Sequence, residues 1–149
     1  MAFSITFRNE AVSYPYDDRT TPAASGVMVL GDTEEHFLAS LYQWGQEDYE
    51  KQWRHAMEVL LDETDKAALI TTYGSPDVAT HLEWWPMYLV GSRVFFQNHL
   101  LFYHQLREPF SVDKALSFLR DRETIDAEGK TISEWSVSLS EVEAFAGTL

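Results

Sequence analysis

Histidines and carboxylates are the side chains in this sequence that could support metal binding or acid–base catalysis. The five histidines are His36, His55, His81, His99 and His104. A helical metal site needs a second ligand four residues away, and neither His55 nor His99 has one. His99 and His104 lie five positions apart near the end of an expected strand, so they should point to opposite faces. We interpret the histidines as ordinary surface or core residues.

Adjacent carboxylates could in principle share a proton in an active site. Glu34–Glu35 and Asp17–Asp18 are such pairs. Neighbouring residues of a strand point to opposite faces, so neither pair has the spacing of a catalytic dyad. The sequence also has no serine in a nucleophile-elbow motif and no glycine-rich phosphate loop. We therefore predict no catalytic activity, no cofactor and no bound metal.

Length and composition limit the class of protein. A chain of 149 residues with 45% hydrophobic residues predicts one globular domain spanning residues 1–149. Cysteine is absent, which removes disulfide scaffolds, cysteine nucleophiles and thiolate metal sites. No apolar run reaches the length of a membrane span, and the first ten residues do not resemble a signal peptide. We therefore expect a cytoplasmic protein without a membrane partner.

Charge argues against nucleic-acid binding. The chain has 11 Lys and Arg against 24 Asp and Glu, a net charge of −13. Phosphate binding requires cationic side chains that displace counterions, so DNA or RNA would be repelled.

Alternating apolar residues predict that most of the regular structure is strand. The expected strands cover residues 3–7, 12–16, 27–30, 36–41, 66–73, 82–90, 93–102 and 132–139. Gly91-Ser92 joins two of these strands, 82–90 and 93–102, in a hairpin, with glycine first as a type II′ turn requires. Residues 19–26 are expected to form a loop, residues 31–32 a turn, and residues 126–130 a second turn.

Helices are expected at three places. Tyr49, Trp53, Met57 and Leu60 recur at helical spacing and predict an amphipathic helix. A second helix is expected from Ser111, as N-cap, to residue 119, and a short last one after a capping box at Ser140 and Glu143. Strands and helices do not alternate regularly, so the prediction is an α+β fold with mainly antiparallel sheets braced by two to three helices.

Acidic residues are concentrated between residues 31 and 65. This segment holds ten carboxylates and only two cations, Lys51 and Arg54. A solvated face that keeps the chain soluble is one explanation. As a set, however, these charges would steer a basic partner, an effect that salt weakens. The distribution favours a basic protein ligand.

The tryptophans indicate where the sheet is covered. Trp53 lies on the apolar stripe and is expected in the core. Trp84 and Trp85 are adjacent in a strand, so they should face opposite ways. Whichever lies outside the core must be covered by a second packing layer or by a partner.

Three stretches of the sequence resemble a known family. They are Trp44-x4-Tyr49-x3-Trp53, Trp85-x2-Tyr88-x5-Val94-x2-Gln97-Asn98-x3-Phe102, and Arg122-x-Thr124-x-Asp126-x2-Gly129-x2-Ile132-Ser133-Glu134-Trp135. With these motifs the chain resembles the immunity proteins of bacterial contact-dependent growth inhibition systems. In particular, it resembles the group that neutralises a toxin domain cleaving 16S ribosomal RNA. The likeness extends over roughly residues 32–145, and its third stretch is the most specific.

The resemblance implies a non-catalytic protein that binds the nuclease domain of its cognate toxin inside the producing cell. Binding would cover the active site or the RNA-binding surface of the toxin, in a one-to-one complex with a monomeric immunity protein. It also implies a fold similar to the Whirly single-stranded-DNA-binding proteins. A nucleic-acid-binding module of Whirly type, a general protein-interaction domain and an unrecognised enzyme are the alternatives.

The shared motifs are rich in Trp, Gly, Asn and apolar residues, which mark the fold. We expect Gln97-Asn98 to form structural hydrogen bonds, and Arg122, Asp126 and Gly129 to form a turn with an ion pair. Specificity requires surface differences between relatives, so the toxin contacts should lie outside the motifs. The predicted toxin-binding residues are Asp17, Asp18, Asp32, Glu34, Glu35, Glu47, Asp48, Asp62, Glu63 and Asp65.

Overall fold

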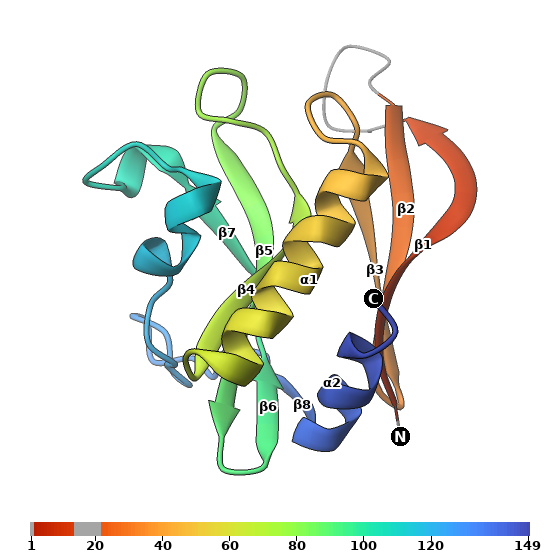
Figure 1. Ribbon diagram of the computed structural model, residues 1–149. Helices are drawn as coiled ribbons and strands as arrows, with labels where there is room; N and C mark the ends of the chain where they lie inside the picture. Colours follow the sequence, from red (N-terminus) through yellow and green to blue (C-terminus); the bar gives the residue numbers. More distant parts are fainter. Residues whose placement is uncertain (1, 14–21) are drawn as a thin grey trace.

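Two antiparallel sheets and two α-helices form the framework of the protein (Figure 1). The computed structural model describes residues 2–13 and 22–149, and the side chains of residues 2–8 and 22–149. The first sheet has the order β1-β2-β3, formed by Ala2–Ser13, Pro22–Gly31 and Thr33–Ser40. The second has the order β4-β5-β6-β8, formed by Lys66–Thr72, His81–Val90, Arg93–Phe96 and Trp135–Ser138. Its fifth strand, β7 (His99–Phe102), pairs with β5.

The helices differ in length and type. Helix α1 spans Gln46–Asp62 and α2 spans Leu139–Ala146. Two 3-10 helices, η1 (Tyr103–Gln105) and η2 (Val112–Phe118), lie between β7 and β8 in the chain. The predicted α+β class, with antiparallel sheets braced by helices, is confirmed. No helix in residues 2–13 and 22–149 is long and apolar enough to cross a membrane.

Aromatic contacts join the two sheets and α1 around a shared core. The ring of Phe3 in β1 stacks on Phe96 in β6, with centroids 5.0 Å apart. Phe7 in β1 contacts Trp53 of α1 at 4.9 Å, and Trp53 donates a hydrogen bond of 2.8 Å from Nε1 to the Ile70 carbonyl in β4. Trp53 is 1% exposed, as its place on the apolar stripe predicted.

Strand β5 lies in the middle of the larger sheet. It pairs with β4 along one edge and with β6 and β7 along the other. The turn to β6 has Gly91 at φ 62° while Ser92 has no positive φ, which agrees with the predicted type II′ turn. The second arm of the hairpin is not one strand, however. It breaks at Gln97-Asn98, because the Gln97 side chain is buried and bonded to the segment before β8.

Both adjacent tryptophans are buried, on opposite faces of β5. Trp85 lies on the same face of β5 as Met87, and its ring contacts Trp135 at 5.4 Å. This face is turned toward the smaller sheet, because Phe96, the cross-strand neighbour of Met87, stacks on Phe3 of β1. Trp84 is covered on the opposite face by Phe110, at 6.2 Å. A second packing layer, built by the chain between β7 and β8, therefore covers this tryptophan.

Four predicted elements differ from the structure in extent or type. Residues 22–26 belong to β2 and not to a loop. Gly26 pairs with Phe37 of β3, and the Phe37 ring covers the glycine. The helix expected from Ser111 is the 3-10 helix η2, interrupted by non-helical angles at Lys114, and Ser111 makes no side-chain cap. The last helix begins two residues earlier than predicted: the Ser138 hydroxyl accepts a bond of 3.2 Å from the Glu141 amide. The preceding strand is shorter than the predicted residues 132–139: it begins at Trp135 and ends at Ser138.

The predictions for the remaining strands hold in their main parts. Residues 27–30 lie in β2, residues 36–40 in β3 and residues 66–72 in β4. The strands expected at 3–7 and 12–16 are not separate, because β1 runs from Ala2 to Ser13. Residues 14–16 of the expected strand and residues 19–21 of the expected loop lie outside the described residues. Gly31 adopts φ 70° at the turn before β3. The turn at 126–130 is also present, closed by a hydrogen bond of 2.8 Å from the Asp126 amide to the Lys130 carbonyl.

Candidate functional site

Helix α1 carries predicted toxin-binding residues at both of its ends. Glu47 and Asp48 are exposed in its first turn, and Asp48 accepts a hydrogen bond of 2.9 Å from the Gly45 amide. Asp62, Glu63 and Asp65 are exposed at its other end. Asp62 follows Glu47 by 15 residues in this helix, which rises about 1.5 Å per residue, so the two groups lie about 22 Å apart. They therefore form two separate acidic surfaces.

A third acidic group lies on the smaller sheet. Asp32 is in the turn between β2 and β3, and Glu34 and Glu35 follow in β3. Asp32 and Glu34 are exposed, whereas Glu35 is half-buried. This turn lies toward the same end of the molecule as α2 and the last turn of α1 (Figure 1). Asp17 and Asp18 lie outside the described residues.

A groove of about 570 Å³ borders the last turns of α1. Of the predicted toxin-binding residues that the structure describes, Asp62 lines this groove. Its other walls come from β5 and α2, which are distant in the sequence. Sequence reasoning missed this groove, because no local pattern indicates that α2 packs beside α1.

Motif residues build a polar network under the segment before β8. Gln97 is 2% exposed, and its Nε2 donates to the Glu123 carbonyl at 2.9 Å and to Glu134 Oε2 at 2.8 Å. Arg122 binds both oxygens of the Glu134 carboxylate, at 2.6 and 2.9 Å, and lies over the Phe95 ring at 4.2 Å. The structural role predicted for Gln97 is confirmed. The partner of Arg122 is Glu134 and not Asp126.

The pKa values in this network follow from its contacts. Burial raises the pKa of the Glu134 carboxyl, but the hydrogen bonds from Arg122 and Gln97 outweigh it and hold that pKa below 4.5. Burial, with the carboxylate of Asp121 as the next cause, raises the pKa of Tyr88 to about 12. Its hydroxyl therefore stays protonated and donates to the Arg120 carbonyl at 2.9 Å. This hydrogen bond fixes the start of the segment before β8 to β5.

Histidines do not gather in the described part of the chain. No group of three or more His, Asp or Glu residues with metal-binding geometry occurs in residues 2–13 and 22–149. His99 Nε2 is 2.8 Å from the Gln97 Oε1, and burial lowers the pKa of His99. His104 lies in η1 and not in a strand, so the predicted opposite facing of the two residues was based on a wrong element.

Comparisons with known proteins identify the class. A family model described as the CdiI N-terminal domain matches residues 39–145. The chain is 29% identical over 123 residues to the immunity protein CdiI of Enterobacter cloacae, covering 82% of this chain and 83% of that protein. It also matches a chain of the solved CdiA-CT/CdiI toxin and immunity complex from Enterobacter cloacae. That match has a TM-score of 0.88 and 26% identity, and it covers 98% of this chain and 97% of the other.

These matches define an immunity protein, a class that acts by binding and not by catalysis. The chain belongs to the CdiI family. The predicted resemblance to immunity proteins of contact-dependent growth inhibition systems is thereby confirmed at the level of the family, and the matched residues include all three motifs. The structural match covers 98% of the chain, more than the sequence resemblance, which extended over roughly residues 32–145.

Proposed function

We propose that this protein binds and neutralises the CdiA C-terminal toxin domain encoded with it. The observation that carries the proposal is the likeness, over nearly the whole chain, to a chain of a solved toxin and immunity complex. The aromatic core and the polar network would hold the fold, and the surface around them would select the toxin.

The proposed toxin is a nuclease that cleaves 16S ribosomal RNA. A nuclease must present cationic side chains to the phosphates of its substrate. An inhibitor with a net charge of −13 and exposed carboxylates can occupy the same cationic surface. The exposed carboxylates at the ends of α1 and in the turn before β3 support this mechanism. The toxin would be met in the cytoplasm, where ribosomal RNA lies.

We further propose that residues 1–149 act as one domain and as a monomer, in a one-to-one complex with the toxin. A single hydrophobic cluster draws residues from both sheets and both α-helices, which favours one folding unit.

A binding titration against the purified toxin domain at two salt concentrations tests the proposal. We expect a one-to-one complex with a nanomolar or lower Kd, and a Kd that rises with salt because charged surfaces meet. RNA cleavage by the toxin should stop at one equivalent of this protein. An immunity protein for a different toxin is the control. If the protein neither binds the toxin nor reduces cleavage, the proposal is wrong.

A further inference from the structure

The groove beside α1 is formed by three elements that are distant in the sequence. Its walls are the last turns of α1, Leu89 of β5, and α2 with the residues that follow it. In Figure 1, α2 lies to the right of the last turns of α1, and both helices lie in front of the strands. The two helices contact each other only in part, which leaves the groove between them open.

The floor of the groove is apolar and its rim is acidic. Leu61, Leu89 and Leu139 are half-buried and retain exposed apolar surface. Glu58, Asp62 and Glu143 stand exposed on the rim, against the single cation Arg54. Among the described residues, no ion pair or side-chain hydrogen bond neutralises these three carboxylates. The groove is therefore hydrophobic at its base and negative at its edge.

We propose that this groove receives a segment of the toxin domain in which an apolar side chain is flanked by lysine or arginine. This inference rests on the proposed function and assigns the place of contact. Removing the leucine floor from water favours an apolar insert, and the unpaired rim carboxylates favour cations beside it. A desolvated apolar anchor within a charged rim is the usual arrangement at the energetic centre of an interface.

The size and charge of the groove suit a protein segment. Its volume of about 570 Å³ lies in the range of about 300–1,000 Å³ that encloses a drug-sized molecule, so it admits a few side chains. A nucleic acid would bring phosphates against the rim carboxylates, which is unfavourable. Asp62 belongs both to this rim and to the acidic segment found in the sequence, so electrostatic steering and docking would meet at one place.

Gly147 offers a way to block the groove without disturbing the fold. It follows α2 with φ −67°, which any residue can adopt. A Cβ atom there would lie 3.6 Å from the Ala144 carbonyl oxygen and 3.7 Å from that of Glu143, which are ordinary contacts. We expect Gly147→Trp to fold normally and to raise the Kd for the toxin domain at least tenfold. Ala144→Trp, at an exposed position of α2 outside the groove, is the matched control and should change the Kd less than twofold.

Reversing the rim charges tests the other half of the proposal. The variant Glu58→Lys/Glu143→Lys should raise the Kd at low salt at least tenfold, and less at high salt. Glu108→Lys/Glu128→Lys makes the same change in net charge at exposed positions away from the groove, and should have a much smaller effect. Thermal unfolding of each variant shows whether the fold is intact.

The outcomes separate the inference from the proposed function. If the unmodified protein binds the toxin and both groove variants bind it equally well, the groove inference is overturned and the immunity function stands. If the groove variants alone lose affinity, the inference is supported. If the unmodified protein does not bind the toxin, the proposed function fails first and the groove inference fails with it.

Discussion

The Nε2 atom of Gln97 donates a hydrogen bond of 2.8 Å to Oε2 of Glu134, 37 positions further along the chain. Arg122 adds two bonds to the same carboxylate, so Glu134 is held from both sides. The segment from Arg120 to Glu134 contains no strand or helix of its own beyond one isolated bridge. This carboxylate therefore fixes a long irregular segment to the end of β6.

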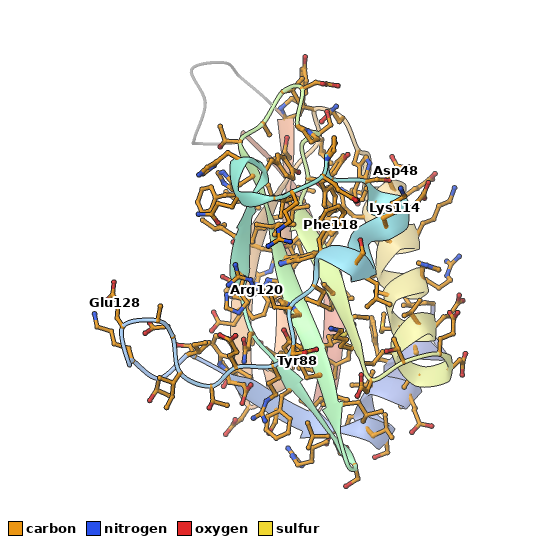
Figure 2. All side chains as sticks on the ribbon, turned by 90° about the vertical axis from the view of Figure 1, so that its left-hand side faces the viewer. Asp48, Tyr88, Lys114, Phe118, Arg120 and Glu128 are labelled. Atoms are coloured by element: carbon orange, nitrogen blue, oxygen red, sulfur yellow. The ribbon has the colours of Figure 1, made fainter. Side chains whose placement is uncertain are left out.

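Replacing the carboxylate should destabilise the protein. Glu134→Gln keeps the shape but leaves the half-buried Arg122 guanidinium without a counterion and sets an amide NH2 against existing donors. Hydrogen bonds to charged groups contribute about 1.5–3 kcal/mol each, so we expect the free energy of unfolding to fall by about 2 kcal/mol. Urea unfolding at neutral pH measures it. Glu128→Gln, whose carboxylate lies 3.7 Å from Lys130 in an exposed turn (Figure 2), should change it by less than about 0.5 kcal/mol.

The difference in stability between the unmodified protein and Glu134→Gln should depend on pH. The pKa of Glu134 is lower in the folded than in the unfolded protein, so its contribution is fully present above the unfolded value of 4.5 and is lost as the pH falls through the folded value. Glu134→Gln should therefore approach the unmodified protein in stability below pH 4.5. Chemical unfolding at pH 7, 5 and 3.5 tests the direction. A difference that is constant over this range would contradict the assigned role.

The hydroxyl of Tyr49 links α1 to the end of β3 and to the residue that follows β4. Tyr49 of α1 is fully buried; its OH donates to the Ser40 carbonyl at 2.7 Å and accepts from the Tyr73 amide at 2.9 Å. Tyr49→Phe leaves both backbone groups without this partner, and the expected loss of stability is about 1–3 kcal/mol. Tyr42→Phe, at a side chain that is 59% exposed, is the control and should leave the melting temperature unchanged.

Gly26 has no room for a side chain. A Cβ atom there would lie 2.2 Å from the Phe37 ring, which covers the glycine from the neighbouring strand. We expect Gly26→Ala to destabilise the protein by about 1–3 kcal/mol, because Phe37 must leave its position in the core. Gly45→Ala, where the nearest atom would be Asp48 Oδ2 at 3.8 Å, should be tolerated. Equal stability of the two variants would show that the Phe37 ring moves freely.

The acidic end of α1 should act on the rate of association. Asp62→Ser/Glu63→Ser/Asp65→Ser should slow binding to the toxin domain about tenfold at low salt and less than twofold at high salt. These carboxylates lie at a helix C-terminus, where negative charge is unfavourable, so the variant should fold at least as well as the unmodified protein. Glu108→Ser/Glu123→Ser/Glu128→Ser carries the same net charge and is the control for stopped-flow measurements. An unchanged rate at both salts would remove these residues from the interface.

Local patterns were sufficient where one element decides its own structure. The stripe from Tyr49 to Leu60 predicted α1 and its buried face, since helical spacing alone brings these side chains together. Gly91-Ser92 likewise predicted the tight turn of the hairpin. The prediction was wrong where a partner decides. Residues 22–26 looked like a loop by composition, yet pairing with β1 and β3 makes them a strand.

The candidate site was harder to predict than the fold. The acidic segment is continuous in the sequence, but the length of α1 separates Glu47 and Asp48 from Asp62. The acidic residues before α1 lie elsewhere, in the turn between β2 and β3 of the smaller sheet and in β3 itself. The groove depends on α2, whose start was also predicted two residues late because Ser140 and Glu143 mimic the spacing of the true cap at Ser138 and Glu141. Long-range packing decides both features, and no single segment encodes it.

Hydrogen exchange of the β5 amides can be used to measure complex formation, because β5 lies in the middle of the larger sheet. Strand β5 pairs with neighbouring strands on both edges, and residues 84–88 are buried, all of them except Pro86 carrying an amide hydrogen. Such amides exchange with solvent deuterium only when the whole protein unfolds. A ligand that binds only the folded state lowers that unfolded population by the factor 1 + [L]/Kd. Deuterium uptake at β5 would therefore report the affinity of any partner, without a label and wherever on the surface that partner binds.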